Sequence, residues 1–150
     1  MKRFRFRLKR LQELRTLEEE RAEAALRQAR ARVAGAEDVV HGLHNDVTEV
    51  FSGLTRALAS GRVAPEEPAR VTAHAARIEL ALAVAQRDLE LARRLASEAA
   101  ADLQKRRSER KALDELERRA RETWHVDAVR EENAFFDEVA VMRHAASQLR

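Results

Sequence analysis

The feature that most constrains the fold is a pair of long heptad repeats, in which apolar residues recur with alternating steps of four and three. The first repeat has apolar residues at positions 22, 26, 29, 33, 36, 40, 43, 47, 50, 54 and 57, and the second at positions 71, 75, 78, 82, 85, 89, 92, 96, 99 and 103. A sustained spacing of about 3.5 residues in helix-favouring sequence is typical of left-handed coiled coils. The sequence therefore predicts two long helices, each with one apolar seam.

The segment between the two repeats interrupts the helical pattern, because it holds both prolines of the chain, Pro65 and Pro68. The simplest path folds the chain back at this point, so that the two helices run antiparallel. We predict an all-α fold: a two-helix antiparallel coiled-coil hairpin that forms a single domain over residues 1–150. Helix 1 is expected at about 4–59, the turn at about 60–68, and a longer helix 2 at about 69–143.

The register of this hairpin follows from the position of the turn. If the turn centres near Ala64, the numbers of facing residues sum to about 128 or 129. The predicted pairs are Leu54 with Ala75, Val50 with Ile78, Val47 with Leu82, Leu43 with Ala85, Val40 with Leu89, Ala36 with Ala92, Ala29 with Ala99, and Leu26 with Leu103. Every pair is apolar on both sides, which supports the register.

Beyond Leu103 the second repeat becomes polar. Arg106 and Arg110 take seam positions, and the same rule sets them opposite Ala22 and Glu19. Two interpretations remain open. One is a solvated charged layer that contributes little stability, and the other is a polar layer that fixes the register.

Toward the open end of the hairpin, apolar residues return on both helices. Helix 1 offers Phe4, Leu8, Leu11, Leu14 and Leu17, and the expected facing residues on helix 2 are Leu113, Leu116, Ala120 and Trp124, with Phe4 beside Trp124. Helix 2 then outruns helix 1 by about twenty residues. This extension carries Phe135, Phe136, Val139, Val141 and Met142. An apolar set without a covering helix indicates a binding partner.

The composition argues against an enzyme. Charged residues make up 37% of the chain and aromatic residues only 4%, and a seam between two helices is too narrow for a deep pocket. We find no glycine-rich phosphate loop, no nucleophile elbow and no zinc-protease motif. His41 and His44 are three residues apart, but no third ligand accompanies them. We therefore predict no catalytic residues, no cofactor and no metal.

Charge, cysteine content and hydropathy set further limits. The 29 basic and 26 acidic residues nearly balance, so the net charge of +3 does not require nucleic acid as a partner. Without cysteine there is no disulfide framework. The longest uncharged stretches, residues 39–45 and 80–86, are far shorter than the roughly 20 apolar residues of a membrane-spanning helix. We expect a soluble protein with no transmembrane segment.

A basic run opens the chain and alternates with two phenylalanines. Its bases are Lys2, Arg3, Arg5, Arg7, Lys9 and Arg10, interleaved with Phe4 and Phe6. An acidic protein surface is the partner we favour. A frayed, solvated end whose phenylalanines cap the coiled coil is the close alternative, and nucleic acid is a distant third.

Two segments resemble a known family. The opening Lys-Arg-Phe-Arg-Phe-Arg-Leu-Lys-Arg-Leu-Gln-Glu-Leu-Arg at residues 2–15, followed by three glutamates at 18–20, is similar to the start of flagellar export proteins of the FliJ family. The segment Arg-Glu-Glu-Asn-Ala-Phe-Phe-Asp-Glu-Val-Ala-Val-Met-Arg at residues 130–143 resembles the family's final segment. The hairpin form and the longer second helix agree with this resemblance over the whole chain.

The resemblance implies a non-catalytic stalk of the flagellar type III export apparatus, located in the cytoplasm at the inner-membrane flagellar base. Its open end would insert into the hexameric export ATPase, and the stalk would also engage the cytoplasmic domain of the export gate and export chaperones. The ring-facing residues would be Phe4, Arg5, Phe6, Arg7, Phe135, Phe136, Asp137, Glu138, Met142 and Arg143. The gate contact, which is aromatic and aliphatic in some members, would fall on His74 and Ile78. We expect the free chain to be a monomer.

Other functions remain open at this point. The equivalent stalk of a virulence-type type III secretion system obeys the same physics, although the Phe-Arg-Phe-Arg opening favours the flagellar system. A generic coiled-coil scaffold would dimerise along its length and bind no ATPase. A nucleic-acid binder would show affinity that falls steeply with salt.

Overall fold

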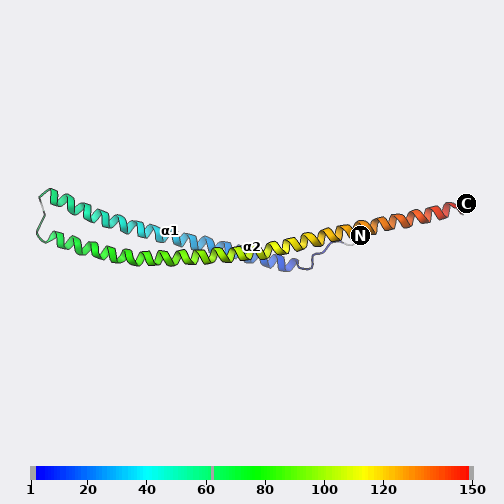
Figure 1. The fold of residues 1–150 in the computed structure, drawn as a ribbon, viewed down its shortest axis with the longest axis horizontal. Coiled ribbons are helices and arrows are strands. Elements are labelled where there is room, and N and C mark those ends of the chain that lie inside the picture. Colours follow the sequence, from blue (N-terminus) through cyan, green and yellow to red (C-terminus); the bar gives the residue numbers. More distant parts are fainter. Residues whose placement is uncertain (1–2, 62, 149–150) are drawn as a thin grey trace. The chain divides into compact units, whose positions relative to one another are not determined.

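The computed structural model describes residues 3–61 and 63–148, with side chains described as far as His144; Lys2 and Arg62 lie outside the described residues. It consists of two helices, α1 at Lys9–Ala59 and α2 at Glu67–Gln148 (Figure 1). The helices pack against each other, α2 is the longer, and the described residues contain no strand. The all-α prediction with a longer second helix is confirmed.

The chain divides into two compact units, which are described separately below. The hairpin unit is Glu20–Gln104, which contains the turn. The terminal unit combines Met1–Glu19 with Lys105–Arg150. The expectation of a single domain stays a prediction.

The seam of the hairpin unit follows the two heptad repeats closely. Every predicted seam position from 22 to 57 and from 71 to 103 is buried or half-buried. Among the other described residues in these two ranges, only Glu23 and Gly53 are not exposed. The most buried seam residues are Ala22, Leu26, Ala75, Ala85, Leu89 and Leu103. Apolar burial along this seam is thus the main stabilising term of the hairpin unit.

Cross-helix contacts test the predicted register. Leu26 and Leu103, a predicted pair, form one cluster with Ala22, and Ala99 packs against it. Nearer the turn, Arg93 bridges to Glu37 with an Nη2–Oε1 distance of 2.7 Å. Both contacts join positions whose numbers sum close to the predicted value. The pairing of Leu26 with Leu103 is therefore confirmed.

The turn has a clear physical cause. Gly61 adopts a positive φ of 66°, which a side chain would disfavour, and its N–H donates to the Leu58 carbonyl oxygen at 3.1 Å. α2 begins at Glu67, two residues before the expected start. The earlier start is possible because proline is tolerated in the first turn of a helix, as Pro68 is here, and because the Glu67 carboxylate suits the positive helix end.

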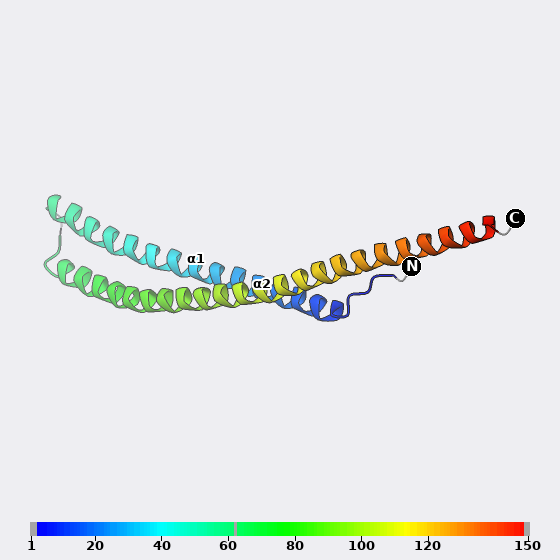
Figure 2. The same cartoon turned by 45° about the vertical axis from the view of Figure 1, so that its right-hand side comes forward.

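In the terminal unit, α1 begins at Lys9 and not at about Phe4 as predicted. Residues 3–6 have no regular structure and residues 7–8 form a turn (Figure 2). A run of bases without an acid opposes the positive end of a helix, and no acidic residue occupies the first turn of α1. Phe4 and Phe6 are half-buried, while Arg3, Arg5 and Arg7 are exposed. This alternation suits non-helical chain better than it suits a helix.

Leu11, Leu14 and Leu17 of α1, and Leu8 just before it, do not form a buried seam with α2 as predicted. Leu8, Leu11, Leu14 and Leu17 are 37–51% exposed, as is the expected facing residue Leu116, at 47%. α1 continues without a break, so the phase of its seam is set by the hairpin unit and falls on positions 19, 15 and 12. Leucines three residues apart instead shift around the helix by about 60° at each step. Gln12, Arg15 and Glu19 consequently take the seam positions.

α2 extends to Gln148, beyond the expected end near residue 143. From Val129 to His144 every residue is exposed except Val139, which is half-buried. We call residues 129–144 the overhang. An exposed apolar extension of α2 was predicted from the sequence, and the exposure of these residues agrees with it.

A matched pair of leucine substitutions on α2 should separate the seam from the outer face. Leu103→Ala removes a side chain that is 6% exposed, and we expect a loss of about 2–4 kcal/mol in the free energy of unfolding. Leu91→Ala removes one that is 57% exposed and should change it by less than about 0.5 kcal/mol. Urea denaturation followed by circular dichroism measures both. Equal losses in the two variants would contradict the assigned seam.

Candidate partner-binding end

An aromatic contact holds the non-helical residues 3–8 against α2. The rings of Phe4 and Trp124 meet edge to face, with centroids 6.0 Å apart and an interplanar angle of 62°. The Arg121 guanidinium lies 5.1 Å from the centroid of the Phe4 ring, a cation–π arrangement. The predicted proximity of Phe4 and Trp124 is confirmed. The contact forms although Phe4 is not in a helix.

Two hollows adjoin residues 3–8. The apolar hollow has a volume of about 910 Å³ and includes Phe6, Leu8, Leu116, Ala120 and Trp124 in its lining. The basic hollow has a volume of about 860 Å³. Its charged lining residues are Arg3, Arg5, Arg7, Lys9, Arg10, Arg121, Glu13 and Glu117. The terminal unit thus presents an apolar and a cationic concave surface on one short segment.

The two helices of the terminal unit are joined mainly through polar side chains, which we call the ionic seam. Gln12 donates from Nε2 to Asp114 Oδ1 at 2.6 Å and to Glu117 Oε2 at 3.0 Å. The hydrogen bond from Gln12, followed by that from Arg121, holds the pKa of Glu117 below its usual range. Leu113, which is 8% exposed, is the buried apolar residue within this seam. Polar contacts therefore join α1 and α2 in the region where packing between leucines was expected.

Glu19 is the most buried charged residue of the described chain, at 9% exposure. Its carboxylate accepts hydrogen bonds from Arg110 Nε and, at 3.2 Å, from Arg107 Nε. The Arg110 bond is the main cause of a lowered pKa at Glu19, and Glu19 in turn raises the pKa of Arg110. Arg110 also donates from Nη1 to Asp114 Oδ2 at 2.6 Å. A buried carboxylate is tolerated because two guanidinium groups satisfy it.

A second cluster of four charges extends the ionic seam. Arg15 Nη1 lies 2.7 Å from Glu18 Oε2 and 2.9 Å from Glu109 Oε2. Arg106 Nη1 approaches the same two carboxylates at 3.3 and 3.7 Å. Each arginine thus bridges α1 and α2, and the Glu18 hydrogen bond is the first cause of the raised pKa of Arg15. The ionic seam thus joins the two helices through two adjacent clusters of charges.

This arrangement bears on the two interpretations of the polar layer. The layer is not solvated throughout, because Glu19 is buried. The Glu19–Arg110 pair also occupies the alignment predicted by the register rule. Whether the layer fixes the register stays a hypothesis.

The remaining ring-facing candidates lie on the overhang. Phe135 and Phe136 are 61% and 58% exposed, with ring centroids 6.1 Å apart. They line a hollow of about 350 Å³ with Ala128 and Glu131, two residues that also line the apolar hollow. Met142 is 58% exposed, and Asp137, Glu138 and Arg143 are exposed as well. The candidates from the two ends of the sequence thus fall on neighbouring surfaces of the terminal unit.

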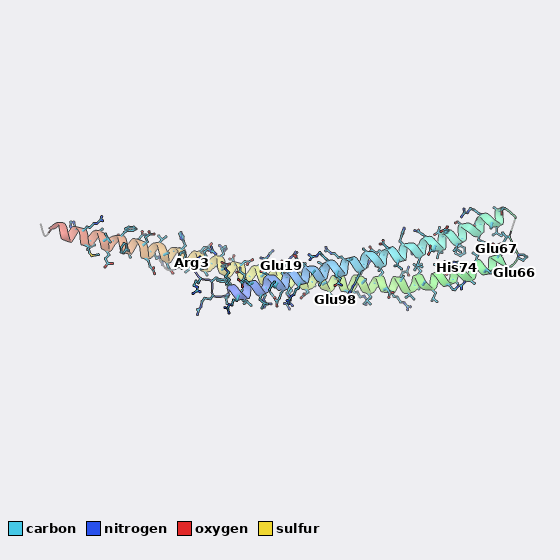
Figure 3. The ribbon with its side chains drawn as sticks, turned by 180° about the vertical axis from the view of Figure 1, so that it is seen from behind. Arg3, Glu19, Glu66, Glu67, His74 and Glu98 are labelled. Carbon is cyan, nitrogen blue, oxygen red and sulfur yellow. The ribbon has the colours of Figure 1, made fainter. Side chains whose placement is uncertain are left out.

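The gate candidates lie in the hairpin unit near the turn. His74 is exposed (Figure 3). Ile78 is half-buried at a seam position. Both line a hollow of about 450 Å³ together with Val50, Gly53 and Leu54. Ile78 is therefore largely occupied by packing within the hairpin unit.

A row of exposed apolar residues on α2 was missed by the sequence reasoning. Leu80, Val84, Leu91 and Leu95 are 43–70% exposed and follow one another at steps of four, seven and four residues. Positions with this spacing share one face of a helix. The row is visible in the sequence once the seam positions are set aside, because the remaining leucines still keep a heptad-like spacing.

Residues 3–61 and 63–148 contain no group of three or more histidines and carboxylates placed to hold a metal ion. Across the same residues, neither helix has an apolar stretch long enough to cross a membrane.

The fold and its exposed end define an all-α coiled-coil protein whose terminal unit presents aromatic, aliphatic and basic side chains. The sequence model of a family described as "Flagellar FliJ protein" matches residues 4–149. The chain belongs to this family, which is a non-catalytic component of the flagellar export machinery. No curated protein and no solved structure showed significant similarity to the chain.

Removing the buried charge should produce a stability change that depends on pH. Glu19→Gln should lower the free energy of unfolding at pH 7, because two arginines lose their ionised partner. A lowered carboxylate pKa stabilises the fold above the ordinary pKa of about 4.5 and ceases to do so as the pH falls through the lowered value. The gap between wild type and variant should therefore be full at pH 7 and shrink below about pH 4.5.

Thermal unfolding between pH 7 and pH 2 measures this gap, with Glu20→Gln as the control because Glu20 is the exposed neighbour. A gap that does not change with pH would show that the charge of Glu19 contributes nothing.

Proposed function

We propose that this chain is the stalk of the flagellar type III export apparatus. The terminal unit inserts into the hexameric export ATPase, and the hairpin unit contacts the cytoplasmic domain of the export gate. Export chaperones are further partners, and the free chain is a monomer. Family membership supports the export machinery as the setting of this proposal.

The observation that carries the proposal is the exposed apolar surface of the overhang. Phe135, Phe136, Val141 and Met142 are all 58–68% exposed, and α1 does not cover them. Large apolar side chains gathered at one end of a protein mark an interaction site. The hollow lined by Phe135 and Phe136 shares Ala128 and Glu131 with the apolar hollow beside residues 3–8, so one partner could contact both.

The mechanism needs no chemistry within this chain. One chain inside a ring of six equivalent subunits contacts some of them and not others. It therefore stabilises one conformation in the subunits that it touches, and it shifts their equilibrium by the difference in its affinity for the two conformations. Rotation of these contacts around the ring would couple ATP hydrolysis to export.

The test is ATP hydrolysis by the cognate export ATPase with and without the purified chain. The triple variant Phe135→Ser, Phe136→Ser and Met142→Ser should lose the stimulation, because it removes the exposed apolar anchors. A control variant, Val39→Ser, Leu58→Ser and Leu91→Ser, removes three residues that are 55–57% exposed in the hairpin unit. It should keep the stimulation. Full stimulation by the overhang variant would contradict the proposed working end.

The gate contact is proposed for the exposed row of α2 rather than for the seam. His74 is exposed near the turn, and Leu80 is 70% exposed. Ile78 contributes less, because it packs within the hairpin unit. The gate-binding surface would then combine His74 with Leu80 and Val84, which share the same half of the hairpin unit.

Leu80→Ser with Val84→Ser should weaken binding to the isolated gate domain by about tenfold, since both exposed apolar groups are lost. Isothermal titration calorimetry measures the affinity, and ATPase stimulation should be unchanged because the terminal unit is intact. Unchanged gate affinity would reject this surface.

A further inference from the structure

Residues 3–8 combine half-buried aromatic side chains with exposed basic ones. Phe4 and Phe6 are half-buried, whereas Arg3, Arg5 and Arg7 are exposed. In the described part of the chain the structure shows no ion pair for these three arginines. The segment is therefore held in place by its aromatic residues while its charges remain available.

The described residues leave the apolar hollow beside this segment open. Its volume of about 910 Å³ falls within the range of roughly 300–1,000 Å³ typical of ligand sites. Leu8 and Leu116, which line it, are 40% and 47% exposed. A large apolar side chain of a partner would cover these two leucines and remove apolar surface from water.

The charged residues around the apolar hollow determine which sign of charge is favoured in its occupant. Six basic residues and two glutamates line the basic hollow. One of these glutamates, Glu117, already accepts hydrogen bonds from Gln12 and Arg121. Arg3, Arg5, Arg7, Lys9 and Arg10 then remain against Glu13, while Asp127 and Glu131 line the apolar hollow. The net charge around the site is therefore positive, and it attracts the carboxylates of a partner.

We infer that residues 3–8 and the facing part of α2 form a docking site for an acidic peptide loop that carries one large apolar side chain. The apolar side chain enters the apolar hollow, and flanking carboxylates pair with Arg3, Arg5 and Arg7. The identity of the loop's owner, the export ATPase, rests on the proposed function. The chemistry of the loop rests on the structure.

The geometry disfavours the other anionic partners. Single-stranded nucleic acid stacks its bases on free aromatic faces. Here Phe4 and Trp124 pack against each other, and Arg121 lies over the Phe4 ring. A membrane surface would take up the phenylalanines beside the arginines, but Phe4 and Phe6 are half-buried, and the exposed Leu8 lines the apolar hollow.

Trp124 supplies a direct readout, because it lines the apolar hollow and is the one tryptophan of a chain without tyrosine. Its emission is titrated with the peptide Gly-Asp-Glu-Leu-Glu-Asp-Gly and with the neutral peptide Gly-Asn-Gln-Leu-Gln-Asn-Gly. The acidic peptide should bind about tenfold more tightly, and the difference should shrink in about 0.5 M NaCl. Replacing the peptide's leucine with serine should weaken binding further.

Two variants test the two halves of the site. Ala128→Leu fills the apolar hollow with a helix-favouring residue, and Arg3→Ala with Arg5→Ala and Arg7→Ala removes the charge. Each variant should bind the acidic peptide about tenfold more weakly than the wild-type chain does. The matched controls are Ala100→Leu and the triple change Arg27→Ala, Arg30→Ala and Arg32→Ala, all at exposed positions. Circular dichroism verifies that every variant keeps its helices.

The outcomes separate this inference from the proposed function. Equal affinity for the acidic and neutral peptides, or full affinity in both site variants, would overturn the docking site. So would a Trp124 shift produced by phosphatidylglycerol vesicles or oligo-dT at lower concentration than by the peptide. If the wild-type chain fails to stimulate the ATPase but binds the acidic peptide selectively, the proposed function fails while the docking site stands. Stimulation that survives both site variants would reject the docking site and leave the stalk function in place.

Discussion

The rest of the structure depends on the continuity of helical phase along α1. A helix that runs unbroken from Lys9 to Ala59 must present one face along its whole length, and the apolar seam of the hairpin unit decides which face that is. In the terminal unit the same face carries Gln12, Arg15 and Glu19, so the polar residues are placed between the helices. The leucines at 11, 14 and 17 are left on the outside. One constraint thus produces both the ionic seam and the exposed apolar residues of the terminal unit.

The two seams stabilise the helix pair by different means. Alanine and leucine packing is non-directional, and its contribution grows with the apolar area that is removed from water. The ionic seam instead depends on specific geometry, since Glu19 is tolerated only while Arg107 and Arg110 remain in place. Surface pairs along α2 add little by comparison; Glu115, whose pKa is lowered to about 2 by Arg118 and Arg119, pairs only within its own helix.

Most of the fold was predictable because the heptad spacing identifies the buried face of each helix. The positions that recur at intervals of about 3.5 residues are the ones that are buried. The helix ends and the terminal unit were less predictable. The start of α1 depends on how a run of bases meets the positive end of a helix. The alternation of Phe4 and Phe6 with arginines was noted in the sequence but was not used to place the start of the helix. The prediction for Leu11, Leu14 and Leu17 was wrong because it followed their apolar character and ignored their position around the helix relative to the seam. The contact of Phe4 with Trp124 was predicted from the register of the two helices, even though the backbone at Phe4 is not helical. The exposed row at Leu80 and Val84 was missed because one stripe per helix was assumed.

The overhang has a consequence for the thermodynamics of any association. Residues 129–144 have no facing helix, and a single helix of this length is only marginally stable in water. Backbone amides there should open far more readily than those beside Leu103, where two helices share the burial. A partner that covers Phe135 and Phe136 would have to supply the ordering free energy of this segment before any net affinity appears. Affinity at this end is therefore set both by the contacts and by the helix propensity of residues that never touch the partner. Substitutions at such overhang positions would change the affinity through the stability of the helix.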